Sequence, residues 1–354
     1  MCIVYNTIGS LTVVKSHLQK HNVYDFKSIK ELMNFQKDYS NAQLQIISNH
    51  TILIKQEENS LESEIPQLET FIEIKRKETE QKLLSDLDLL KQRLEMLSSV
   101  QPNVFKTLIN YFHKINIKKK IQIEEFKLDS RVADSIMESE DSLNKKKNRY
   151  QFIVTQFNDA VKQSGKYELH ELERKKKIID AVNNSIYGAI GEQKVLKELK
   201  KLSDDYIVIN DFNYSFARAI YYHDRNEYIK SIQIDHLLIS PVGVFIIETK
   251  NWSEHSLNNL DLRSPVDQIR RANFALYKIL NERTHKFLDS HHWGQKKFPV
   301  RNLIVLINRK PKEEFQYVKV LTLSELQNYL AYFQPLFSQR EVKNAASYLM
   351  DINS

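Results

Sequence analysis

Three charged residues stand at the ends of two short apolar segments. Asp235 belongs to the segment QIDHLLIS, and Glu248 and Lys250 belong to the segment VFIIETK. The turn-forming residues Pro241–Gly243 separate the two segments, so we expect a β-hairpin. Side chains alternate along a strand, which places Glu248 and Lys250 on the same face of that hairpin.

The chemistry of this trio depends on the register of the hairpin. If Asp235 lies opposite Glu248, all three charged groups converge, whereas a shift of one residue turns Asp235 to the other face. Charged groups among apolar neighbours are costly unless they are paired, hydrated or bound to a metal ion. Two carboxylates supply hard oxygen ligands for Mg²⁺, and a lysine can orient or deprotonate a water and stabilise transition-state charge. The trio therefore suits metal-assisted hydrolysis of a phosphodiester.

A third acid, Glu192, lies upstream in the segment YGAIGEQKVLKEL. It precedes Val195 and Leu196 by three and four residues, which places it on the buried stripe of an amphipathic helix. Gly188 and Gly191 have no side chains, so the turn beside Glu192 can approach a sheet closely. The alternative is a glutamate near a helix start that the helix dipole favours.

These segments together resemble a known family. GAIGE at 188–192, QIDH at 233–236 and GVFIIETKN at 243–251 resemble the nuclease-related domain, NERD, which belongs to the wider PD-(D/E)xK nuclease-like fold. SPVDQIRR at 264–271 resembles the later helix of that family. The resemblance covers about residues 183–330 and says nothing about residues 1–180.

The resemblance implies a role for each matched position. Asp235 and Glu248 would be the main metal ligands, Glu192 a further acid near the metal, and Lys250 the catalytic lysine. Gln268 would be a supporting polar residue that faces the active cleft. No proline precedes Asp235, a departure that removes no ligand. The implied cofactor is Mg²⁺ or Mn²⁺, and the implied partner is nucleic acid, for which we expect DNA rather than RNA.

Residues 1–180 carry a different pattern. No glycine occurs between residues 10 and 164, and Pro66 and Pro102 are the only prolines before residue 241, so long helices are expected. Leucines recur at spacings of 4, 3, 4 and 3 from Leu83 to Leu97, as in a coiled coil. Pro66 predicts a new helix start or a kink. The break at 98–103 predicts a reversal into an antiparallel hairpin.

Three basic runs lie in this helical region, at 118–120, 145–147 and 174–177. Runs of this kind are most often solvated helix faces. The alternative is a basic rail for a phosphate backbone. Net charge does not decide between them, because the excess of +7 is modest and spread evenly along the chain.

From about residue 181 short apolar runs appear between turn residues. They predict strands at 206–210, 232–239, 244–249, 303–307 and 318–323, with helices at 183–202 and 265–283. A final pair of helices begins near Ser324, which forms a capping-box pattern with Gln327. We therefore expect an α+β protein: a helical coiled-coil arm over 1–180, for dimerisation or sensing, and a small α/β PD-(D/E)xK-like nuclease domain with C-terminal helices over 181–354.

Composition excludes several classes of protein. The single cysteine, Cys2, rules out a disulfide scaffold and fits a reducing, cytoplasmic compartment. No apolar run is long enough to span a membrane, and the first residues lack the basic start of a signal peptide. No Walker loop or dinucleotide-binding motif is present. His285, His291 and His292 lack a second ligand motif with metal spacing, so no zinc site is expected there.

Three functions from different classes remain. The first is a metal-dependent DNA endonuclease that forms a homodimer or higher oligomer through the helical arm, so that two subunits can cut both strands. The second is a nucleic-acid-binding module that does not cut, and the third is a coiled-coil adaptor. A nuclease joined to a helical sensor arm would suit bacterial defence against phage or plasmid DNA, an expectation from architecture alone.

Overall fold

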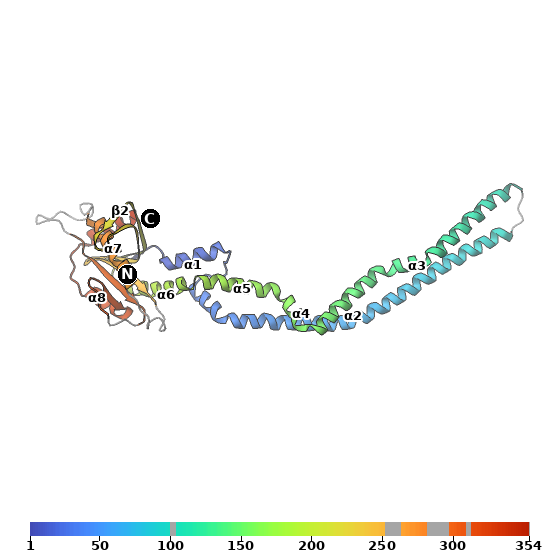
Figure 1. The fold of residues 1–354 in the computed structure, drawn as a ribbon, viewed down its shortest axis with the longest axis horizontal. Helices are drawn as coiled ribbons and strands as arrows, with labels where there is room; N and C mark the ends of the chain where they lie inside the picture. The colour runs from blue at the N-terminus through green and yellow to red at the C-terminus, as the bar shows by residue number, and fades with distance from the viewer. Residues whose placement is uncertain (100–103, 252–262, 282–296, 309–312, 354) are drawn as a thin grey trace. The chain divides into compact units, whose positions relative to one another are not determined.

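A computed structural model of the chain describes residues 1–99, 104–251, 263–281, 297–308 and 313–353. Internal contacts divide it into two units (Figure 1). Met1–Lys37 and Arg174–Ser354 form one, here the sheet unit, and Asp38–Glu173 form the other, here the arm. This division differs from the expected boundary at residue 180, because the first 37 residues group with the C-terminal part of the chain.

The arm is helical. Helix α2 (Ile29–Ser99) begins in the sheet unit, and α3 (Val104–Thr155) runs antiparallel beside it (Figure 1), followed by α4 (Phe157–Ser164) and α5 (Lys166–Ala181). The buried seam includes Ile54 and Leu87 on α2 and Ile136 on α3. Helix α2 continues through Pro66, so no new helix starts there. Residues 100–103 of the predicted reversal lie outside the described residues.

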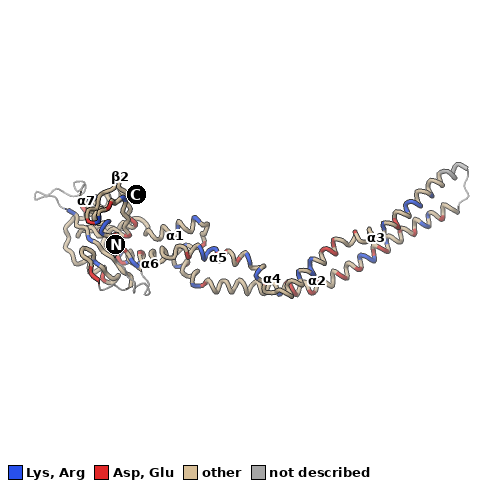
Figure 2. The backbone as a smooth tube through the Cα atoms, viewed as in Figure 1, with Lys and Arg blue, Asp and Glu red and all other residues tan. Residues whose placement is uncertain are grey.

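Several basic residues of the arm have acidic partners. Lys147 pairs with Glu69, and Arg149 pairs with Glu57 at 2.8 Å, so these ion pairs join α3 to α2. Figure 2 shows acidic and basic residues interspersed along both helices. This distribution favours solvated, ion-paired helix faces over a basic rail for phosphates.

A six-stranded sheet organises the other unit, with its strands in sequence order. Strands β2, β3 and β4 are antiparallel neighbours, β1 is parallel to β2, and β4, β5 and β6 are parallel. The strands are β1 (Ile3–Tyr5), β2 (Ile207–Tyr222), β3 (Glu227–Ser240), β4 (Gly243–Lys250), β5 (Val300–Leu306) and β6 (Lys319–Thr322). The five predicted strands are present with shifted ends, whereas β1 and the second half of β2 were not predicted.

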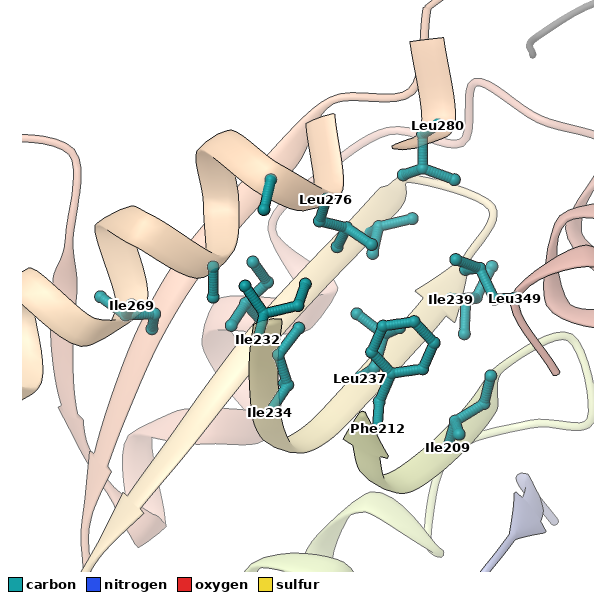
Figure 3. Close-up of a cluster of buried hydrophobic side chains, with 14 of the residues drawn as sticks. Ile209, Phe212, Ile232, Ile234, Leu237, Ile239, Ile269, Leu276, Leu280 and Leu349 are labelled. Carbon is teal, nitrogen blue, oxygen red and sulfur yellow. The ribbon is translucent and has the colours of Figure 1, made fainter. Parts of the chain in front are cut away.

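Helices cover both faces of this sheet. The side chains of α6 (Asn183–Leu199) and α8 (Leu326–Ala331) pack into the core on one face. Those of α7 (Arg263–Asn281) and α9 (Gln339–Ile352) pack into the core on the other. Figure 3 shows α7 lying over the strands of this second core, and the structure is α+β as predicted. No helix in the described part of the chain combines the length and hydropathy of a membrane span.

The predicted capping box at Ser324 is wrong. The structure has the box two residues earlier, where Thr322 caps the short 3₁₀ turn Leu323–Glu325 together with Glu325. Gln327 instead donates a hydrogen bond to the Glu198 carbonyl. The sequence contains two overlapping capping-box patterns, Thr322 with Glu325 and Ser324 with Gln327. The first is formed because the glutamate supplies a charged acceptor for the free backbone N–H groups.

The N-terminal segment is integral to the sheet unit. Strand β1 pairs with the start of β2, and the Asn210 side chain donates hydrogen bonds to the carbonyls of Tyr5 and Asn6. Helix α1 (Gly9–Lys20) packs on α6, where Val14 and Leu18 share a buried cluster. Their partners in that cluster include Ile186 and Ala189 of α6.

Candidate active site

The register of the β3–β4 hairpin places Asp235 opposite Glu248, as the convergence of the three charged groups requires. In the β3–β4 pair His236 lies opposite Ile247, and continuing this register by one residue sets Asp235 opposite Glu248. At this point a side chain takes part in the hydrogen bonding between the two strands. The Asp235 carboxylate accepts a hydrogen bond from the Thr249 backbone N–H at 2.8 Å. Asp235 is thereby fixed at the end of the hairpin.

Glu248 is the most enclosed acid of the hairpin. Its side chain is 5% exposed, and Lys250 donates to one of its oxygens at 2.7 Å. Gln268 of α7 donates to the other oxygen at 3.4 Å. The Lys250 side chain is 26% exposed, so it is less enclosed than the Glu248 carboxylate that it contacts.

Glu192 enters the site from α6. It is buried, with 5% of its surface exposed. A Cβ on Gly191 would lie 2.9 Å from the Asn251 Cβ and 3.2 Å from the Thr249 side chain, so only glycine permits this approach of α6 to the end of β4. The side chain of Ser10 and its backbone N–H both donate hydrogen bonds to the Glu192 carboxylate.

The acids share one electrostatic environment. Burial, together with the charges of Glu248 and Glu192, raises the pKa of Asp235 well above its usual value. Burial also raises the pKa of Glu192, against the opposing hydrogen bonds from Ser10. For Lys250, burial lowers the pKa, but the nearby carboxylates outweigh it and the net shift is upward. The structure thus brings Glu192, Asp235, Glu248, Lys250 and Gln268 together.

Sequence reasoning missed a fourth acid beside this group. Asp211 adopts a left-handed backbone conformation with φ 49°, and the β2–β3 register places it across from Asp235. It accepts a hydrogen bond from Gln233 at 2.8 Å, and its charge contributes to the raised pKa of Glu192. The signal in the sequence is an acid that interrupts the apolar alternation between Ile209 and Phe212, which both pack into the same core.

His236 is a structural residue. It is fully buried and pairs with the Asn210 side chain at 2.7 Å. Burial lowers its pKa to about 3, so the imidazole is neutral at physiological pH. His285, His291 and His292 lie outside the described residues.

The donor chemistry of the site fits a hard divalent cation. Asp235, Glu248 and Glu192 offer carboxylate oxygens, and Lys250 supplies a positive charge beside Glu248. Burial disfavours the ionised forms of Asp235 and Glu192, and a bound cation would offset that cost. Among the described residues no three acidic, histidine or cysteine side chains form a ready-made ligand set. To bind one cation together, the three carboxylates would have to change their side-chain conformations. Their charges already influence one another in the present arrangement.

The comparison with protein families agrees with the predicted resemblance. Residues 187–307 match the family described as NERD, the nuclease-related domain, which confirms the prediction made from the motifs. The matched range contains all five predicted site residues and excludes Ser10. No curated protein and no solved structure matches the chain.

Proposed function

We propose that this chain, which carries a nuclease-related domain over residues 187–307, is a metal-dependent nuclease that hydrolyses phosphodiester bonds. The single observation that supports this most is the convergence of Asp235, Glu248 and Lys250 at the end of one hairpin. A purely structural sheet has little reason to gather buried acids of like charge, since their repulsion destabilises the fold.

In this proposal each side chain has a distinct task. Asp235 and Glu248 would hold a divalent cation, Mg²⁺ or Mn²⁺, with Glu192 as a further ligand. When bound there, the cation would supply Lewis-acid chemistry that polarises the phosphate and acidifies a water. Lys250 orients the attacking water and stabilises the negative charge that develops on the phosphate oxygens. Gln268 holds the Glu248 carboxylate in place through its hydrogen bond.

A cleavage assay tests the proposal directly. Supercoiled plasmid DNA and a matched RNA are incubated with Mg²⁺ or Mn²⁺ and with the full chain or its variants. Asp235→Asn and Lys250→Met remove the central groups, and Asp224→Asn and Lys230→Met are matched controls at exposed positions. We expect cleavage by the wild type and both controls, and a loss of at least about 100-fold in Asp235→Asn and Lys250→Met.

The same assay separates the alternatives. Cleavage that survives in Asp235→Asn contradicts the proposed site. No cleavage by any form, with DNA retained in gel shifts, supports a nucleic-acid-binding module instead. No binding at low salt leaves a coiled-coil adaptor. We propose DNA as the substrate. Faster cleavage of the RNA than of the DNA would contradict that choice and identify RNA as the substrate.

For the arm we propose self-association or sensing. A homodimer or higher oligomer would bring two such sites to one duplex and allow cleavage of both strands. Size-exclusion chromatography with light scattering measures this state, and a monomer at micromolar concentration contradicts it. We further propose a role in defence against phage or plasmid DNA. Equal phage plating on cells that carry the wild type or Lys250→Met would contradict that role.

A further inference from the structure

We propose that Ser10 of α1 is a positioning residue of this site, which fixes the Glu192 carboxylate for cation binding. The inference rests on the proposed function and deepens it. Ser10 lies 177 residues before the start of the family match, so nothing in the matched range accounts for it. The nuclease site would then depend on a segment that the chain supplies from its N-terminus.

The contacts are specific to one carboxylate. The Ser10 hydroxyl donates to Oε1 of Glu192, and the Ser10 backbone N–H approaches Oε2 at 3.3 Å. Both oxygens therefore have a donor from the first turn of α1. Each carboxylate oxygen has two lone pairs, so both retain capacity for a cation. Hydrogen bonds of this kind orient metal ligands and raise their affinity.

Gly188 preserves the space that Ser10 needs. A Cβ at residue 188 would lie 2.8 Å from the Ser10 Oγ, which is shorter than the van der Waals contact distance between a carbon and an oxygen atom. Gly188 is one turn before Glu192 on α6, so α1 approaches α6 at the turn that carries the acid. A methyl group at 188 would push the Ser10 hydroxyl away without changing Ser10 itself.

Ser10 is also held in place. The preceding strand β1 pairs with β2 from Ile3 to Tyr5, and the buried Asn210 side chain donates to the Asn6 carbonyl at 3.0 Å. After Ser10, Val14 packs into a buried cluster with α6. A donor fixed on both sides can define the orientation of the acid that it contacts.

The test measures cation affinity on the full chain, without substrate. Isothermal titration with Mn²⁺ compares the wild type, Ser10→Ala, Gly188→Ala and Glu192→Gln. Ser203→Ala is the matched control, because Ser203 also donates to a carboxylate, that of Asp205, outside the site. We expect Ser10→Ala and Gly188→Ala each to weaken Mn²⁺ binding by about 10-fold or more, and Ser203→Ala to leave it unchanged.

A double variant shows whether Ser10 acts through Glu192. In the Glu192→Gln background, Ser10→Ala should cause no further loss of affinity, because the residue that it positions has already been neutralised. A full additional loss in that background overturns the proposal. So does Mn²⁺ binding by Ser10→Ala that is as tight as that of the wild type, or tighter. If the wild type binds no Mn²⁺, the proposed function itself fails and the inference fails with it.

Discussion

Replacement of Asp235 by asparagine should stabilise the protein when no divalent cation is present. Burial, together with the charges of Glu248 and Glu192, raises the pKa of Asp235 well above its usual value, so the ionised form of Asp235 is costly in the folded protein. The asparagine keeps an oxygen that can accept the Thr249 N–H bond. Relief of such functional-site strain commonly stabilises a protein by about 0.5–2 kcal/mol. In a unit of this size that corresponds to roughly 1–8 °C in Tm.

The pH dependence has a definite sign. A carboxyl whose pKa is raised on folding binds its proton more tightly in the native state, so the wild type loses stability as the pH rises above the unfolded value, about 4. The advantage of Asp235→Asn should therefore appear above that pH, grow as the pH rises towards the raised native pKa of Asp235, and level off beyond it. A saturating divalent cation reverses the order, because binding at 100 times Kd stabilises the wild type by about 2.7 kcal/mol.

Lys250→Met should change the stability of the same site in the opposite direction, by destabilising the protein. It leaves the buried Glu248 without its cation, and the partial exposure of Lys250 limits the cost to about 1–3 kcal/mol. Thermal unfolding in chelator and then in Mn²⁺, read by fluorescence and circular dichroism, measures all three proteins. Asp224→Asn serves as the control. The reasoning is refuted if Asp235→Asn is less stable than the wild type in chelator at pH 8.

Two further predictions concern the N-terminal segment. Burial raises the pKa of Cys2 to about 11, which makes its thiolate at pH 8 roughly 100-fold rarer than usual, so iodoacetamide should label the native protein at least that much more slowly than the urea-unfolded chain. Rapid native labelling, read by mass spectrometry, would show that β1 is not held in the sheet. Second, residues 1–37 joined to 174–354 by a short Gly/Ser linker should unfold cooperatively, whereas 181–354 alone should melt at a lower temperature or aggregate. Equal melting of the two fragments would contradict the division into units.

The C-terminal strands were predictable because each is local in sequence. Alternating or continuous apolar runs between turn residues mark β3, β4 and β5, and the turn at Pro241–Gly243 fixes the register that sets Asp235 opposite Glu248. Glu192 was predictable as a buried acid from its place on the apolar stripe of α6. Its contact with Ser10 was not, because no local pattern links two helices separated by the whole arm.

The strand β1 and the full length of β2 escaped prediction for physical reasons. Strand β1 has three residues, too few to show a period, and its pairing with β2 spans about 200 residues of sequence. In β2 the left-handed residue Asp211 shifts the alternation by one, so Ile209 and Phe212 face the same core and the pattern of a single strand is lost. At this position the charge of Asp211 contributes to the raised pKa of Glu192.

The arm is inserted within the sheet unit rather than attached before it. The chain leaves the sheet unit along α2 and returns to it along α5. Two contacts within the sheet unit hold these helices: Gln36 of α2 donates a hydrogen bond to Asp180 of α5 at 3.1 Å, and Lys175 of α5 pairs with Asp25 at 3.0 Å. Helix α1, which precedes α2, carries Ser10, and helix α6, which follows α5, carries Glu192. At the candidate site the hydrogen bonds between Ser10 and Glu192 join these two segments again, in addition to the contact between Gln36 and Asp180. The Ser10–Glu192 pair therefore connects the chain before the arm directly to one of the acids of the candidate site.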